Sequence, residues 1–98
     1  MQGAIYKLVD SIEMVCRVQS ELGAETSYIL CAPVVARSSW RVITPKLHIS
    51  CTVDEEPHLI LMSQMIALPS YQLGAVVGDA SARRDDIVAA VDLLVSGF

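Results

Sequence analysis

Apolar and polar residues alternate along most of this chain, and a period of two is typical of β-strands that bury one face. Near the carboxyl end the apolar residues instead recur every three or four positions, as they do in an amphipathic helix. The alternation predicts strands at 4–9, 12–18, 27–35, 46–53 and 58–62, with 69–73 as a candidate for a last short strand. The segment 63–68 is expected to be a short helical or irregular link, and 36–45 shows no clear pattern.

Two of the predicted strands have a face that can be assigned to the core. These faces consist of Ile12, Met14, Cys16 and Val18 in the second strand, and of Leu47, Ile49, Cys51 and Val53 in the fourth. The third strand is almost entirely apolar, which favours a central position in the sheet. Asp10-Ser11 predicts an antiparallel hairpin between the first two strands, and Asp54-Glu55-Glu56-Pro57 predicts a second turn.

The most clearly defined element is a helix over Arg83–Val95. Its apolar stripe consists of Ile87, Val91 and Leu94, with Val88 and Val95 beside them. Asp79 or Ser81 is expected to cap this helix, and Gly97 to end it. Strands followed by one helix make an α+β fold, so we expect an antiparallel sheet or partial barrel covered on one side by the helix.

The composition adds an expectation about assembly. The chain has 98 residues, which is enough for one domain, 1–98, with a single core. Of these residues 53% are apolar and only 18% are charged, which leaves more apolar surface than so small a body can bury. We therefore expect part of that surface to contact a second copy in a homodimer.

The charge and the cysteines indicate the class of partner and the cellular compartment of the protein. The net charge is −4 and the seven Lys and Arg residues are scattered, which argues against direct binding of nucleic acid. No apolar run is long enough for a membrane helix, and the start of the chain lacks the pattern of a secretory signal. Three widely spaced cysteines without a C-x-x-C motif fit a cytoplasmic protein.

Candidate catalytic chemistry is sparse. The glycine-rich phosphate loops, the zinc-protease motif and the serine-hydrolase motif are all missing from the sequence. Cys51 with His48 or His58 is a candidate Cys–His pair, but Cys51 shares a face with core residues, which favours an inert thiol. The three cysteines, with His48 and His58 as the only extra ligands, are better explained as buried apolar fillers than as a metal site. The acidic turn is better explained as a solvated turn than as a metal site. We therefore predict a protein that acts by binding, is not an enzyme, and uses no metal or cofactor.

Two further features are given structural interpretations. Arg83-Arg84-Asp85-Asp86 is interpreted as the solvated first turn of the helix, with local ion pairs. Trp40 is interpreted as a packing residue at the edge of a dimer rather than a platform for a ligand.

Several short pieces of the sequence also occur together, in this order, in a known family. They are Met1-Gln2, Ile5-Tyr6, Val18-Gln19-Ser20-Glu21, Leu47, Asp54-Glu55-Glu56, Met65, Pro69, Leu73-Gly74 and the whole segment Ala82–Phe98. Their order, and the arginine–aspartate helix that ends in a glycine and an aromatic residue, resemble the CcdB toxins of bacterial toxin–antitoxin modules. The segment Ala24–Pro45 matches the family weakly.

The resemblance implies a fold and two protein partners. The fold is an antiparallel, SH3-like sheet with a C-terminal helix, shared with the MazF and Kid toxins and assembled as a homodimer. The implied target is the A subunit of DNA gyrase, which such toxins bind at its dimer axis and trap on cleaved DNA. A CcdA-like antitoxin is the second implied partner, and it wraps the toxin with a disordered C-terminal segment.

The resemblance also implies a gyrase-binding site. In toxins of this family the last three residues of both protomers make the contact, flanked by the loop after the second strand and by one residue a turn back on the helix. These positions map to Ser96, Gly97, Phe98, Ser20, Leu22 and Asp92. The sequence departs from the plasmid toxin at Ser96, where that toxin has a tryptophan that stacks on a gyrase arginine, and serine cannot supply this cation–π contact.

Two alternative functions stay open at this point. A module that keeps antitoxin binding but has lost gyrase binding would account for Ser96. A MazF-like ribonuclease is compatible with the same fold, since fold alone does not determine function. The acidic balance and the lack of an Arg/Ser/Thr constellation on a basic face count against the ribonuclease.

Overall fold

The computed structural model describes residues 1–23 and 26–97. The strands are β1 (Ala4–Leu8), β2 (Met14–Arg17), β3 (Tyr28–Ala36), β4 (His48–Val53), β5 (Glu56–Leu61), β6 (Ile66–Pro69) and β7 (Leu73–Asp79). Short 3₁₀ turns occupy Arg37–Ser39, Met62–Gln64, Ser70–Gln72 and Ser81–Arg83, and one α-helix, α1, spans Arg84–Ser96. No helix in these described ranges is both long and apolar enough to cross a membrane.

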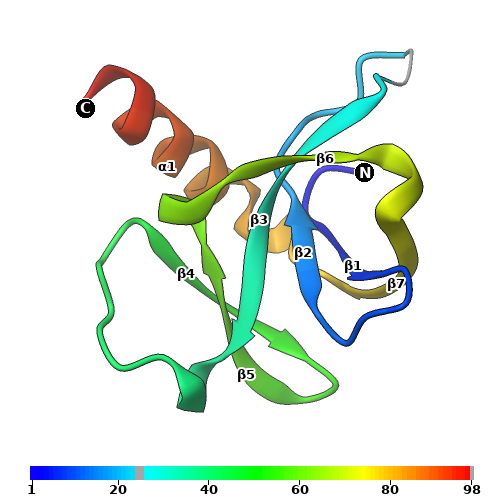
Figure 1. Cartoon of the computed structure of the whole chain (residues 1–98). Coiled ribbons are helices and arrows are strands. Elements are labelled where there is room, and N and C mark those ends of the chain that lie inside the picture. Colours follow the sequence, from blue (N-terminus) through cyan, green and yellow to red (C-terminus); the bar gives the residue numbers. More distant parts are fainter. Residues whose placement is uncertain (24–25, 98) are drawn as a thin grey trace.

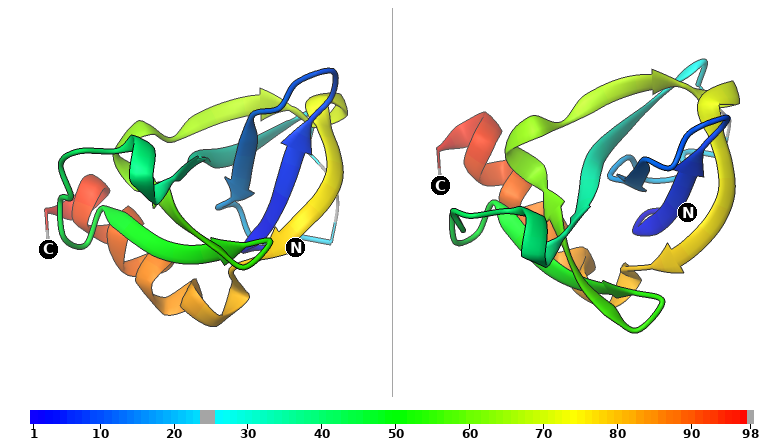
Figure 2. Two further views of the ribbon diagram at one scale, coloured as in Figure 1. Left: turned by 90° about the horizontal axis from the view of Figure 1, so that it is seen from below. Right: turned by 60° about the horizontal axis from the view of Figure 1, so that its bottom comes forward.

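The strands form one antiparallel sheet in the order β4-β5-β3-β2-β1-β7, with β6 paired to β3 (Figure 1). The long strand β3 lies at the centre, as its apolar run predicted, and its second edge is shared by β6 at 28–31 and β5 at 34–36. The first and last strands of this order, β4 and β7, lie close together. A Cβ placed on Gly78 of β7 would lie 3.6 Å from Cγ2 of Val53 in β4. The sheet therefore curls into the predicted partial barrel (Figure 2), and the α+β prediction is confirmed.

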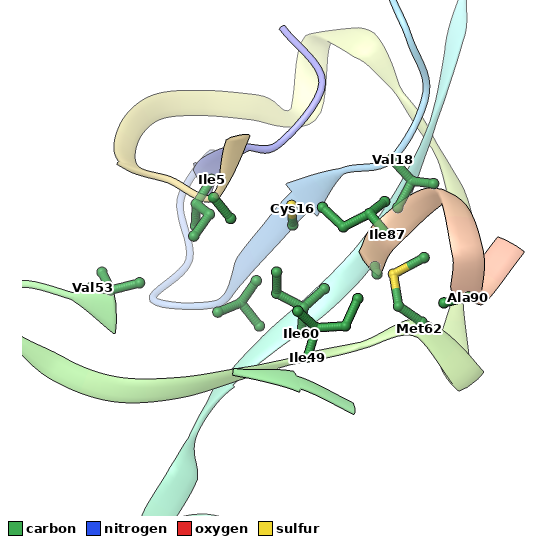
Figure 3. Close-up of a cluster of buried hydrophobic side chains, with 12 residues drawn as sticks. Ile5, Cys16, Val18, Ile49, Val53, Ile60, Met62, Ile87 and Ala90 are labelled. Carbon is green, nitrogen blue, oxygen red and sulfur yellow. The ribbon is translucent and has the colours of Figure 1, made fainter. Parts of the chain in front are cut away.

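The main core fills the inside of this curl. It includes Ile5, Cys16, Ile60 and Met62, all completely buried, and α1 covers it with Ile87 and Ala90 (Figure 3). The predicted core face of β4 is confirmed, since Ile49 and Val53 are buried and Leu47 and Cys51 pack against the cluster.

A second, smaller core lies on the opposite face of β2 and β3. Val15, Ile29 and Cys31 are buried there, under partly buried side chains of β1, β6 and β7. Because β3 buries both faces, its sequence is apolar at nearly every position rather than alternating.

The structure corrects the prediction at three places in the sheet. The segment 63–68 was expected to be a short helical or irregular link, but Ile66–Pro69 forms strand β6, which pairs with β3. Ile12 is not part of the core face of the second strand, because it lies in the turn between β1 and β2 and is 89% exposed. The Leu8 N–H donates to the Glu13 carbonyl at 2.9 Å, so this turn is longer than Asp10-Ser11. The last strand is also not 69–73: Pro69 ends β6, a 3₁₀ turn follows, and β7 begins only at Leu73.

The predicted helix is confirmed, but part of its apolar stripe and its cap are not. Ile87 and Ala90 are buried and Val91 packs against the main core, whereas Val88, Leu94 and Val95 are exposed. The Asp79 carboxylate accepts the Ser81 N–H at 2.8 Å, but neither the 3₁₀ turn Ser81–Arg83 nor α1, which begins after Arg83, has a side-chain cap.

Candidate functional site

The carboxyl end of α1 is an open surface. Asp92 and Ser96 are exposed, and Gly97 takes a left-handed conformation with φ 80° while its N–H donates to the Leu93 carbonyl at 2.9 Å. Glycine accepts this conformation without strain, and such a residue satisfies one of the last free carbonyls of a helix. Among the described residues, and leaving aside its chain neighbours, a Cβ on Gly97 would meet nothing within 4 Å. Three of the predicted site positions thus lie together here, and the fourth, Phe98, lies outside the described residues.

The loop that follows β2 carries the other two predicted positions. Ser20 is exposed and Leu22 is 70% exposed, so both side chains are available to a partner. The Glu21 carboxylate between them lies 2.8 Å from the amino nitrogen of Met1. That hydrogen bond and the positive charge of the amino group lower the pKa of the Glu21 carboxyl.

A single chain does not bring these two groups of residues together. The loop after β2 and the end of α1 lie at opposite sides of the molecule in every view (Figures 1 and 2). Any one target that touches both regions must therefore be large, or must meet them on different copies of the chain.

The sequence analysis missed the residue beneath the loop after β2. Arg17, the last residue of β2, is only 5% exposed, and its Nε donates to the Gln19 carbonyl at 2.9 Å. Its Nη2 also lies 3.5 Å from the Ser20 carbonyl oxygen. The available signal was a charged residue between Cys16 and Val18, inside a strand that is otherwise apolar at this point.

The start of α1 is more than a solvated turn. The predicted local pair exists, since Arg83 Nε lies 2.7 Å from Asp86 Oδ2. In addition, Arg83 Nη1 donates to the Ser50 carbonyl in β4 at 2.6 Å, and Arg84 Nε donates to Gln2 Oε1 at 2.7 Å. The two arginines therefore fasten the helix to the sheet and to the start of the chain.

The thiols occupy environments that disfavour the thiolate. Cys16 and Cys31 are fully buried, and burial raises the pKa of Cys16 to about 12 and that of Cys31 to about 11. Cys51 is partly buried, and desolvation raises its pKa as well. A thiol needs a lowered pKa to act as a nucleophile at neutral pH, so these environments do not activate any of the three.

The histidines make contacts within their own neighbourhoods. His58 stands opposite Cys51 in the β4–β5 ladder, with its Nδ1 2.9 Å from the Glu56 carbonyl oxygen. His48 Nδ1 accepts the Thr44 N–H at 3.0 Å, and its ring meets that of Trp40 edge to face, so Trp40 is a packing residue as predicted. Within the described ranges, His, Cys, Asp and Glu form no group of three or more that is suited to hold a metal ion.

The acidic segment forms the predicted turn between β4 and β5. Asp54 and Glu55 both have positive φ, at 50° and 65°, and Val53 pairs with Glu56 across a two-residue loop. This conformation matches the right-handed twist of the strands that the turn connects. All three acidic side chains are exposed, in agreement with a solvated turn.

Comparison with known protein families identifies the family to which this chain belongs. The family described as CcdB protein matches residues 5–97, which extend from β1 to the glycine after α1 and include the segment 24–45. The chain belongs to the CcdB family. Membership assigns it to the toxin components of toxin–antitoxin modules. No curated protein matches the chain closely enough to add a finer assignment.

Proposed function

We propose that this CcdB-family toxin binds the A subunit of DNA gyrase as a homodimer and traps the enzyme on cleaved DNA, without catalysing a reaction itself. The observation that carries the proposal is the open end of α1, where the family's contact positions Asp92, Ser96 and Gly97 lie together on the surface. None of them contributes to either core, so they are free to contact another protein.

The open space at Gly97 supports this role. Apart from the two chain neighbours, nothing in the described part of the chain lies within 4 Å of a Cβ at this position, so a partner can approach the backbone closely. Leu94 and Val95 lie in the same turns and are 43% and 78% exposed. Apolar side chains at a polar surface are a common feature of protein-binding sites.

A homodimer is consistent with the separation of the two predicted contact regions. A two-fold dimer presents two copies of each region to a two-fold target such as the gyrase dimer axis. The exposed apolar residues of α1 and the high apolar content of the chain support the same assembly. Sedimentation at micromolar concentration is expected to give twice 10.6 kDa.

Ser96 favours a second candidate, a toxin-like module that binds a CcdA-like antitoxin and no longer binds gyrase. Without the aromatic ring of the plasmid toxin, each protomer loses a cation–π contact of about 0.5–2 kcal/mol. Two copies per dimer then weaken gyrase binding by roughly one to three decades.

Binding to a purified gyrase A-subunit fragment tests the proposal and separates the two candidates. Three proteins are compared: the parent, a variant that ends at Ser96, and Ser96→Trp. Ser38→Trp is the matched control, because Ser38 is exposed on the 3₁₀ turn after β3. The truncated variant is expected to lose binding, Ser96→Trp to bind about 10- to 1,000-fold more tightly, and Ser38→Trp to match the parent. Identical curves for parent, truncated and Ser96→Trp proteins would reject the helix end as the binding site.

A further inference from the structure

Arg17 is a buried cation directly beneath a loop that is otherwise exposed. It is the only buried polar or charged side chain within residues 1–23 and 26–97. It stands opposite Cys31 in the β2–β3 ladder, on the side of the smaller core. Burying a guanidinium group is unfavourable unless its N–H groups find acceptors, so the surroundings of Arg17 must supply them.

The backbone of the loop supplies two of these acceptors. Arg17 Nε donates to the Gln19 carbonyl at 2.9 Å, and Nη2 lies 3.5 Å from the Ser20 carbonyl oxygen. Both carbonyls follow Arg17 by only two or three residues, so the chain must turn over the guanidinium group as it leaves β2. No buried side-chain nitrogen or oxygen in the described part of the chain lacks a hydrogen-bond partner, and this includes the Arg17 guanidinium.

The side chain of Gln19 closes the base of the same loop. Its Oε1 accepts the Leu30 N–H at 3.1 Å, and its Nε2 donates to Thr26 Oγ1 at 2.9 Å. The Val18 and Gln19 N–H groups both donate to the Leu30 carbonyl. The two strand ends are therefore joined below the loop, while its carbonyls at 19 and 20 face inward toward Arg17 and its side chains at 20 and 22 are exposed.

We propose that Arg17 is a positioning residue for partner binding: by holding the carbonyls of Gln19 and Ser20, it fixes the loop in the conformation that presents Ser20 and Leu22. This inference rests on the proposed function for the identity of the partner, a protein surface on gyrase. Arg17 itself is buried, so it acts on the partner through the loop rather than by direct contact. The planar guanidinium reaches two acceptors in fixed directions, which the single ammonium group of a lysine does not reproduce.

The first test measures the loop in the free protein. Backbone NMR order parameters of Ser20 and Leu22 are compared in the parent, Arg17→Met, Arg17→Lys, and Arg83→Met, a control that removes an arginine–carbonyl bond far from the loop. We expect values near 0.85 in the parent and in Arg83→Met, below about 0.6 in Arg17→Met, and intermediate values in Arg17→Lys. Unchanged order parameters in a folded Arg17→Met protein would overturn the proposal. If Arg17→Met does not fold, Arg17→Gln takes its place with the same criterion.

The second test is a double-mutant cycle on binding to the gyrase A-subunit fragment. Leu22→Ala is expected to weaken binding at least 5-fold in the parent and less than 2-fold in the Arg17→Met background, because the loop is no longer presented there. Ser96→Trp is expected to strengthen binding by the same factor in both backgrounds, since it lies on α1. Equal losses from Leu22→Ala in both backgrounds would overturn the positioning role. If no variant binds gyrase, the proposed target is wrong, and the order parameters alone decide the role of Arg17.

Discussion

The two ends of α1 differ sharply although they share one apolar pattern. At its start, Arg83 and Arg84 bond to β4 and to Gln2, and Ile87 is completely buried in the main core. At its end, Leu94 and Val95 are exposed, and Gly97 closes the helix in open space. Figure 1 shows these last turns at the margin of the molecule, beyond the strands that the first turns cover.

This difference separates the part of the helix that stabilises the fold from the part that is free to bind. Helical periodicity alone does not reveal the boundary, because Ile87, Val91 and Leu94 follow one another at helical spacings of four and three residues from the buried start to the exposed end. The boundary is set by where the sheet and the Met62–Gln64 turn end beneath the helix. Substitutions at the start should therefore act on stability, and substitutions at the end on binding.

The largest expected effect is at the buried start. Ile87→Ala removes a completely buried side chain and leaves a cavity, so it should lower the free energy of unfolding by about 2–5 kcal/mol. Val95→Ala at the exposed end is the matched control and should change it by less than about 0.5 kcal/mol. Urea unfolding followed by circular dichroism measures both, and similar losses would show that the end of α1 is packed as firmly as its start.

The same contrast shows how far the sequence could predict the fold. β4 alternates cleanly because only one of its faces is buried, so its end at Val53 and its core face followed from the pattern, while its start lies at His48 rather than at residue 46. β7 could not be placed in the same way, because Leu73–Asp79 is partly exposed on both faces and its apolar residues do not alternate. Ile12 continues the pattern of β2 in the sequence, but the turn before Glu13 removes it from the sheet.

The candidate site was predictable only as a set of positions taken from the family. The sequence could not show that the loop after β2 and the end of α1 lie at opposite sides of one chain, because their separation depends on how the sheet curls (Figures 1 and 2). Arg17 was overlooked because an arginine in a strand is usually exposed, and the turn of the chain over its guanidinium, which helps to bury it, does not show in the pattern of apolar residues.

The next largest effect concerns the bond that fastens the helix to β4. Arg83→Met should lower the free energy of unfolding by about 1 kcal/mol, because the Ser50 carbonyl and the Asp86 carboxylate both lose a donor at a partly exposed site. Arg41→Met, in the exposed segment between β3 and β4, is the control and should be nearly neutral. Equal stability of the two variants would mean that packing alone holds the start of α1.

A smaller, pH-dependent effect is expected at the turn before the helix. The Ser81 N–H and its side chain bond to Asp79 and hold the pKa of this carboxyl below its ordinary value of 3.8. A lowered pKa in the folded state stabilises the protein above the unfolded pKa, and this stabilisation is lost as the pH falls through the folded pKa. Asp79→Asn should therefore be less stable than the parent near about pH 7, and the difference should shrink in acid. Thermal melts over this range measure it, with Asp85→Asn as the control, and a constant difference would contradict the assigned bond.

The smallest expected change in stability is at the exposed end of α1, where the substitution Asp92→Ala should increase stability and weaken binding. Asp92 is exposed, and alanine has the higher helix propensity, so Asp92→Ala should raise the free energy of unfolding by roughly 0.5 kcal/mol. An acidic residue near the carboxyl end of a helix is also disfavoured by the helix dipole, which acts in the same direction. If Asp92 is kept for gyrase, the same variant should bind the A-subunit fragment more weakly while it melts at a slightly higher temperature, as is common where function and stability compete. Denaturant unfolding and binding, measured on one preparation, decide this. A variant that is more stable and binds equally well would show that Asp92 belongs to neither the core nor the contact surface, and would leave Ser96, Gly97 and Phe98 as the proposed contact positions at this end of the chain.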